Sequence, residues 1–142
     1  SKQVFKRYHV GGSLGKTLLL VKDIMVTGKR IPIIDKNKTI KQAAKVISKK
    51  KIGLVLVTKK GKVSTIVTDV DCRRGLARYS KNDKIEKIAT TNPLKIDPDM
   101  TATKSLSIMT QRKITSLIVS SKSGKIKGIC NLQKLLTNGM RL

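Results

Sequence analysis

The sequence repeats itself once, at a distance of 62 or 63 residues. Ile52 pairs with Ile114 at the start of matching apolar runs, and Gly61 pairs with Gly124 at the matching turns. A helix-like pattern precedes both runs, and a second apolar run follows both turns. Self-similarity at a fixed distance indicates one supersecondary unit that is used twice. We therefore expect two similar halves, and 142 residues are too few for two large domains.

Within each half, the apolar residues change from helical spacing to short continuous runs. This pattern predicts the order strand, helix, strand, tight turn, strand, helix, and therefore an α/β fold. The expected strands are 31–34, 54–58, 62–68, 94–96, 116–120 and 125–130, and the expected helices are 39–50, 69–79, 101–112 and 132–137. Thr39, Thr101 and Asp69 are candidate N-caps for three of these helices.

The repeat also sets the expected domain boundaries. The first copy is predicted at residues 21–79 and the second at 84–138, with the polar stretch 80–84 as their boundary. One helix and a few strands cannot bury both apolar faces, so the two copies are expected to pack against each other as one body. Residues 1–20 precede the repeats, and because the sequence begins with Ser1 and not Met, we expect it to be a fragment of a longer protein.

The chain carries a net charge of +24, which first suggests a polyanionic partner such as nucleic acid or an anionic membrane. The basic residues, however, are spread along the whole chain, and the aromatic rings that stack on bases are limited to Phe5, Tyr8 and Tyr79. With 39% hydrophobic residues the chain can still bury a core. We therefore interpret the lysines as solvated surface residues and expect no specific nucleic-acid partner.

Two cysteines, Cys72 and Cys130, stand far apart and belong to no metal-binding motif. We therefore expect no metal site, and a reducing, cytoplasmic location. No run of 18 apolar residues is present, so no membrane partner is expected.

Two short motifs connect the repeat to a known family. Asp23-Ile24-Met25 opens the first copy, and Thr68-Asp69-Val70-Asp71 follows its last strand. The duplicated unit of about 60 residues with these two motifs resembles the cystathionine-β-synthase (CBS) domain. CBS domains occur as tandem pairs that bind adenosine-type ligands between the copies. The resemblance therefore implies a CBS pair and a nucleotide-type ligand near Thr68 and Asp71.

The spacing of Thr68 and Asp71 has a chemical reason. A hydroxyl at the end of a strand can bond a phosphate or ribose oxygen, and a carboxylate one helical turn later can accept hydrogen bonds from ribose hydroxyls. Simple N-capping of the following helix explains the same two residues equally well. At the matching positions the second copy has Asn131 and Lys134, without hydroxyl or carboxylate. The sequence is therefore compatible with a nucleotide site in the first copy and argues against one in the second.

Arg73 and Arg74 follow the motif and could reach a ligand phosphate from the helix. A solvated basic face is the alternative interpretation of these two residues.

Three further segments extend the resemblance to a particular group of CBS-containing proteins. The string from His9 to Lys16, His-Val-Gly-Gly-Ser-Leu-Gly-Lys, precedes the CBS-like part, and the segments Arg73-Arg74-Gly75 and Arg112-Lys113-Ile114-Thr115-Ser116 follow within it. Together they are similar to bacterial arabinose 5-phosphate isomerases, in which a sugar-isomerase (SIS) domain with a His-Pro-Gly-Gly-x-Leu-Gly motif passes into a CBS pair. Here Val10 replaces the proline of that motif.

The resemblance implies that residues 1–20 are the tail of an upstream catalytic domain with its linker. The parent would interconvert ribulose 5-phosphate and arabinose 5-phosphate, for the lipopolysaccharide sugar Kdo, with His9 in its active site. This chain alone would have no isomerase activity and need no cofactor. It would be a regulatory, homo-oligomerising module with an adenosine- or cytidine-type nucleotide effector. A purely structural dimerisation module and a basic nucleic-acid-binding module are the alternatives.

Overall fold

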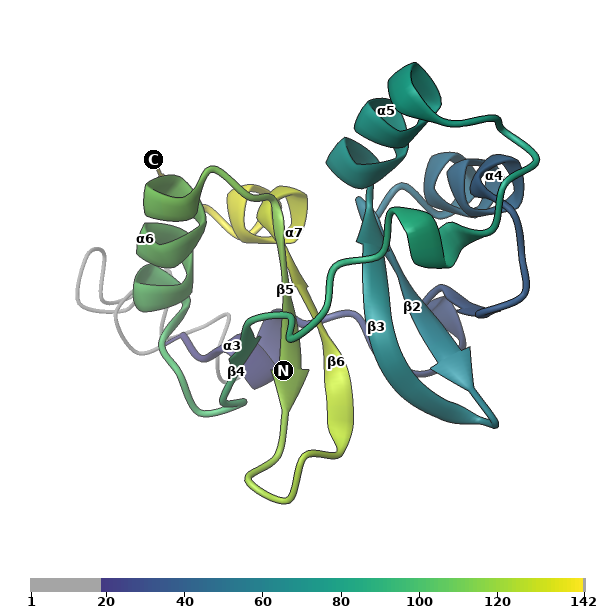
Figure 1. Cartoon of the computed structure of the whole chain (residues 1–142). Coiled ribbons are helices and arrows are strands. Elements are labelled where there is room, and N and C mark those ends of the chain that lie inside the picture. Colours follow the sequence, from purple (N-terminus) through teal and green to yellow (C-terminus); the bar gives the residue numbers. More distant parts are fainter. Residues whose placement is uncertain (1–18, 142) are drawn as a thin grey trace. The chain divides into compact units, whose positions relative to one another are not determined.

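The structure is a computed structural model, and it describes residues 19–141 (Figure 1). By its contacts the chain divides into two compact units. The first unit consists of residues 29–93. The second unit consists of residues 94–141 together with residues 19–28. The string that begins at His9 lies outside the described residues.

The first unit is a three-stranded sheet with two helices (Figure 1). The strand order is β1-β2-β3, with β1 parallel to β2 and β3 antiparallel to β2. Its elements are β1 (Ile33–Asp35), α4 (Ile40–Lys50), β2 (Leu54–Lys59), β3 (Lys62–Thr68), α5 (Asp69–Arg78) and the 3-10 helix η2 (Ile85–Lys87), after the 3-10 helix η1 (Gly28–Arg30) at its beginning.

The second unit repeats this arrangement, with the order β4-β5-β6 and the same parallel and antiparallel pairings. Its elements are β4 (Lys95–Ile96), α6 (Ala102–Arg112), β5 (Ser116–Ser120), β6 (Ile126–Asn131) and α7 (Leu132–Thr137), preceded in the chain by α3 (Val21–Ile24). The repeated α/β unit expected from the sequence is thereby confirmed. The strands shift by one or two residues at several ends, and α3 and the two 3-10 helices were not expected.

The segment that leads into each sheet packs on the sheet of the other repeat, and we call residues 19–28 and 84–93 the exchanged segments. Val26 precedes the first sheet in the chain, but it bridges Ile129 on β6 of the second unit. Thr90 precedes the second sheet, but it bridges Ile66 on β3 of the first unit. The compact units are therefore not the same as the consecutive sequence repeats, because each repeat completes its fold with the segment that leads into the other.

Side-chain caps explain where the helices begin. The hydroxyl oxygens of Thr39 and Thr101 accept hydrogen bonds from the backbone at the third residue of α4 and α6, which confirms both predicted caps. The expectation that Asp69 caps α5 is wrong. Thr68 has the extended backbone of an N-cap and its hydroxyl accepts from Asp71, so Asp69 is already the first helical residue.

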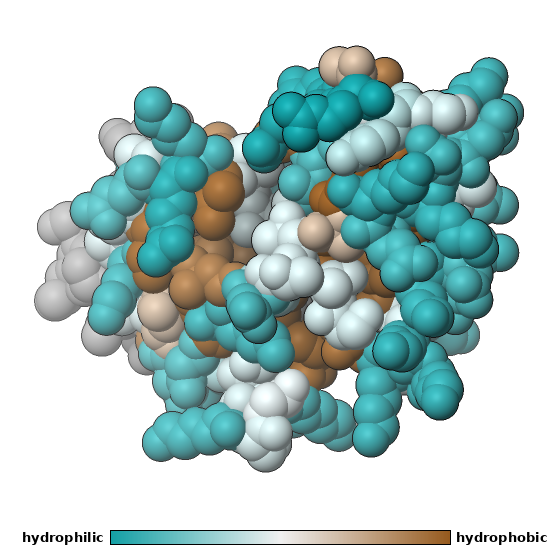
Figure 2. Space-filling view, viewed as in Figure 1, coloured by the Kyte–Doolittle hydropathy of each residue, from teal (hydrophilic) through white to brown (hydrophobic). Residues whose placement is uncertain are grey.

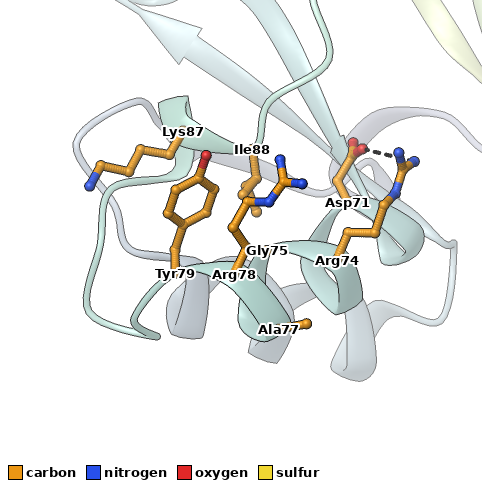
Figure 3. A pocket seen from close by; sticks show the side chains of 8 residues that line it. All are labelled: Asp71, Arg74, Gly75, Ala77, Arg78, Tyr79, Lys87 and Ile88. Atoms are coloured by element: carbon orange, nitrogen blue, oxygen red, sulfur yellow. Dashed lines mark ion pairs between the residues drawn. The ribbon is translucent and has the colours of Figure 1, made fainter.

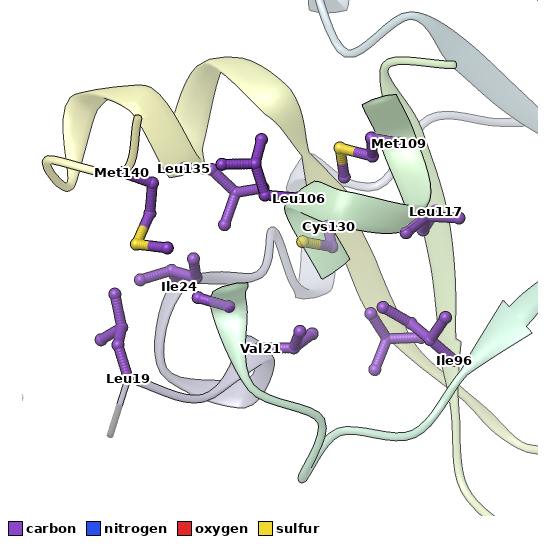
Figure 4. Close-up of a cluster of buried hydrophobic side chains, with 12 residues drawn as sticks. Leu19, Val21, Ile24, Ile96, Leu106, Met109, Leu117, Cys130, Leu135 and Met140 are labelled. Atoms are coloured by element: carbon purple, nitrogen blue, oxygen red, sulfur yellow. The ribbon is translucent and has the colours of Figure 1, made fainter. Parts of the chain in front are cut away.

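Each unit has its own hydrophobic core. In the second unit, residues of the exchanged segment such as Val21 and Ile24 pack with Leu106, Leu117 and Leu135 (Figure 4). In the first unit the helix residues Ala43 and Ile47 pack with the strand residues Val55, Val57 and Val67. Burial of these aliphatic side chains is the main stabilising contribution in both units.

Hydrophilic side chains cover most of the face shown in Figure 2, as expected for a lysine-rich chain. Among residues 19–141, no helix combines the length and the apolar character that crossing a lipid bilayer requires.

Candidate functional site

The start of α5 holds Thr68 and Asp71 in a reciprocal cap. The Thr68 hydroxyl oxygen accepts from the Asp71 backbone N–H at 3.1 Å, and the Asp71 carboxylate accepts from the Thr68 backbone N–H at 3.0 Å. This capping box fixes both side chains at the point where β3 becomes α5. The structure therefore brings the two predicted residues together, and it shows the capping role.

The two oxygens of Asp71 have different surroundings. Oδ2 accepts from the Thr68 backbone and, at 2.8 Å, from the Thr90 hydroxyl on the exchanged segment. Oδ1 lies 4.0 Å from an Arg74 guanidinium nitrogen, at the outer limit of an ion pair. The Asp71 side chain is only 12% exposed. Oδ1 therefore retains acceptor capacity for a further donor, while Oδ2 is committed to the fold.

The two neighbouring arginines have different positions. Arg73 lies 3.5 Å from Asp69, and both side chains are mostly exposed. Arg74 lies beside Asp71 and borders a surface pocket, whereas Arg73 does not. Of the two predicted phosphate contacts, the structure brings only Arg74 together with Asp71.

The pocket has a volume of about 450 Å³ and lies along α5 within the first unit. Gly75 and Ile88 form its apolar part, and Ile88 comes from the segment after η2 (Figure 3). A Cβ on Gly75 would lie 2.5 Å from the Ile88 side chain, so only glycine permits this approach. Besides Asp71 and Arg74, the lining residues are Gly75, Ala77, Arg78, Tyr79, Lys87 and Ile88.

Most of these lining residues could not be found from the sequence motifs. Tyr79 stands out in the sequence only as one of three aromatic residues. Lys87 stacks over the Tyr79 ring with its ammonium 5.4 Å from the ring centre. Lys87 and Ile88 meet α5 through tertiary packing of the exchanged segment, which local periodicity does not record, whereas Tyr79 directly follows α5 in the chain.

The second unit does not reproduce this site. Asn131 caps α7 by accepting from Gln133 at 2.9 Å, and its amide donates to Ser116. Lys134 takes the place that Asp71 has in the first unit. No carboxylate is therefore present at this position of α7 to accept hydrogen bonds.

Neither thiol has the lowered pKa of a reactive cysteine. Burial raises the pKa of Cys72 to about 11, with a further contribution from the charges of Asp69 and Asp71. Burial also raises the pKa of Cys130 to about 11, although its hydrogen bond to Ser105 opposes this effect. Both side chains are buried, and neither forms a disulfide in the described part of the chain. Within the described part of the chain, no three potential ligands among His, Cys, Asp and Glu gather as a metal site would require.

Comparison with known proteins agrees with this architecture. The CBS domain family matches residues 21–78 and 85–140, and the chain belongs to that family as a tandem pair. Similar curated proteins include arabinose 5-phosphate isomerase KdsD from Francisella tularensis (34% identical, 99% of this chain, 44% of that protein) and from Salmonella typhi (32%, 96%, 42%). An uncharacterised protein of Rickettsia prowazekii is 31% identical over 96% of this chain and 43% of its own length.

The chain spans less than half of the length of these curated relatives. Among solved structures, the CBS domain pair of protein MJ0100, determined in complex with 5′-methylthioadenosine and S-adenosyl-L-methionine, has a TM-score of 0.73 and 25% identity over 84% of this chain and 94% of that one. Protein CBSX2, determined in complex with AMP, has a TM-score of 0.69 at 17% identity, over 84% and 94% of the two chains, and supports the fold alone.

Proposed function

We propose that this chain is the regulatory CBS pair of an arabinose 5-phosphate isomerase. The supporting observation is that about a third of the residues are identical to those of KdsD proteins along nearly the whole chain. In this proposal the catalytic part corresponds to the remaining length of those relatives. His9 would contribute to the parent's active site.

The effector that we propose is a nucleotide of adenosine or cytidine type, bound on the first unit at the beginning of α5. The support is the free acceptor capacity of Asp71 Oδ1 next to Arg74, above a pocket of suitable size. The MJ0100 pair, which shares this fold, was solved with two adenosine-type ligands. Thr68 would support the site by holding Asp71 in place, and Arg73 stays a predicted peripheral contact.

One observation favours a second candidate, a structural module without a ligand. Thr68 and Asp71 cap each other and Asp71 also binds Thr90, so the motif has a complete role in the fold alone. Self-association belongs to the proposal in either case, and Val70 and Leu76 are the exposed apolar residues of α5. The two buried, unpaired thiols support a cytoplasmic setting for the protein.

A thermal-shift screen distinguishes the two candidates. AMP, ATP, CMP, CMP-Kdo and S-adenosylmethionine are added separately to the purified chain. A ligand at 100 times its Kd stabilises the folded state by about 2.7 kcal/mol, a shift of roughly 10 °C for a chain of this size. We expect such a shift with at least one nucleotide. No shift with any of them would support the structural module and contradict the effector.

A further inference from the structure

Three segments that are distant from one another in the sequence bring lysines together in the first unit. The segments are 36–41, 59–62 and 81–84, and they contain three, three and two lysines and no arginine. All of these lysines are exposed except Lys36, which is partly buried. We call the lysines of these three segments the lysine surface.

The first of these segments connects the other two. Its Lys36 N–H donates to the Thr58 carbonyl at 2.9 Å, directly before the second segment. Its Lys41 N–H donates to the Lys81 carbonyl at 2.9 Å, within the third segment. The lysine surface is therefore a continuous row that runs from the turn between β2 and β3, along the start of α4, to the chain after α5.

Acidic side chains leave the lysine surface unneutralised. Asp83 is the one acid within the three segments, and its carboxylate lies 3.5 Å from the ammonium of Lys87, outside the lysine surface. Asp35 directly precedes the first segment, and its Oδ1 accepts from the Asn37 backbone N–H at 2.9 Å. None of the ion pairs found between residues 19 and 141 includes a lysine of this surface. Its positive charge therefore remains for an external partner.

The second unit shows that the fold does not require these lysines. At the offset of 62 residues, segment 36–41 corresponds to residues 98–103, which contain no basic residue and one acid, Asp99. The Asp99 carboxylate lies 2.9 Å from the ammonium of Lys22. The same place in the repeated fold is therefore basic in the first unit and holds a neutralised ion pair in the second.

The composition of the lysine surface indicates which partner it suits. Arginine recognises phosphates through its planar fork and aromatic rings stack on bases, but the three segments contain neither. A second copy of the chain carries the same charge of +24 and would be repelled. A lysine ammonium is a compact point charge on a flexible stem, and a row of such charges is complementary to a row of carboxylates.

We propose that the lysine surface binds an extended protein segment rich in Asp and Glu. The turn at which this surface begins is remote from the effector site. Thr68 pairs with Leu54 at one end of β2, and Lys62 pairs with Lys59 at the other end. A strand of this length separates the two ends by roughly 17 Å. The inference therefore goes beyond the proposed function and does not depend on it.

Fluorescence anisotropy with a labelled peptide of consecutive glutamates tests this proposal at roughly 150 mM salt. The whole chain is compared with the double variant Lys59→Gln, Lys62→Gln. Removal of two ion pairs should weaken peptide binding about fivefold or more. A second double variant, Lys36→Gln, Lys38→Gln, changes a different segment of the same surface and should act in the same direction.

The double variant Lys122→Gln, Lys125→Gln is the matched control. It removes the same charge from exposed lysines at the turn between β5 and β6, the corresponding place in the second unit. It should weaken peptide binding by less than about twofold, because exposed charges beyond a Debye length are screened. If it weakens binding as much as Lys59→Gln, Lys62→Gln does, the effect is one of net charge and the proposal is wrong. Equal melting temperatures establish that all variants are folded.

Duplex DNA and phosphatidylserine vesicles test the class of partner. Lysines of the whole chain contribute to contacts with these polyanions, so the variants of the two turns should weaken binding to them equally. If binding to DNA or vesicles depends on Lys59 and Lys62 as strongly as peptide binding does, the surface recognises polyanions in general, and the assignment to an acidic protein segment is wrong. Absence of glutamate-peptide binding to the wild type would overturn the proposal as well.

Discussion

Gly75 is the residue at which the site and the fold depend on each other most closely. It lies in α5, where alanine would be favoured by up to about 1 kcal/mol on helix propensity alone. The missing side chain instead allows Ile88 to pack directly on the helix backbone, which brings the exchanged segment to the pocket.

We expect Gly75→Ala to lower the free energy of unfolding by about 1–2 kcal/mol, because the overpacking cost exceeds the gain in helix propensity. Urea unfolding measures this change. Ile88→Ala removes the clashing methyl group, so Gly75→Ala should be neutral or stabilising in that background. An equal loss in both backgrounds would contradict the close-packing explanation.

The buried thiols predict a pH dependence. Cys72 and Cys130 have a folded pKa of about 11 against an ordinary value of 9.0, so the folded state holds these protons more tightly than the unfolded state. Their contribution to stability is complete below pH 9 and is lost as the pH rises from 9 to about 11.

Unfolding free energies at pH 8 and pH 10 test this predicted loss of stability with increasing pH. Wild type should lose more stability between the two values than a Cys72→Ala, Cys130→Ala double variant, in which the lysines titrate unchanged. A larger loss in the double variant would contradict the assignment of the pKa shifts to burial.

At the scale of elements, the exchanged segments are the least predictable part of the fold. The helices and strands of both repeats follow from apolar periodicity, and Thr39 and Thr101 follow from their position before those helices. Residues 19–28 and 84–93 have no comparable pattern, and their bridges to β6 and β3 are long-range contacts. For the same reason the sequence motifs indicated Asp71 and Arg74, but not Ile88, among the residues that line the pocket.

Ile24 provides a test of how the exchanged segment 19–28 packs in the second unit. It is 7% exposed in α3 and belongs to the core of the second unit. We expect Ile24→Ala to destabilise the protein by about 2–4 kcal/mol in urea unfolding, the usual cost of a large-to-small change in a core. Thr27→Ala, at an exposed position in the same segment, is the control. Equal effects of the two changes would show that the segment does not pack as described.

At the scale of the whole molecule, a net charge of +24 makes contact with any polyanion favourable at low salt. Diffuse lysine contacts release counterions and lose affinity steeply as salt increases. We expect fluorescence anisotropy with duplex DNA to show weak binding at roughly 150 mM salt, without sequence preference. Sequence-selective binding that persists at that salt concentration would contradict our interpretation of the lysines and favour a nucleic-acid-binding module.

The most direct test of the effector proposal is a calorimetric titration of wild type, Asp71→Ala and Lys134→Ala with the nucleotide that gives the largest thermal shift. Loss of the Asp71 acceptor should remove a charge-assisted bond of roughly 1.5–3 kcal/mol and weaken affinity about tenfold or more. Lys134→Ala should bind like wild type, because the second unit has no carboxylate at that place. A purely capping role predicts that Asp71→Ala costs up to about 1 kcal/mol of stability without changing affinity. Equal affinity in all three proteins would therefore contradict the ligand site.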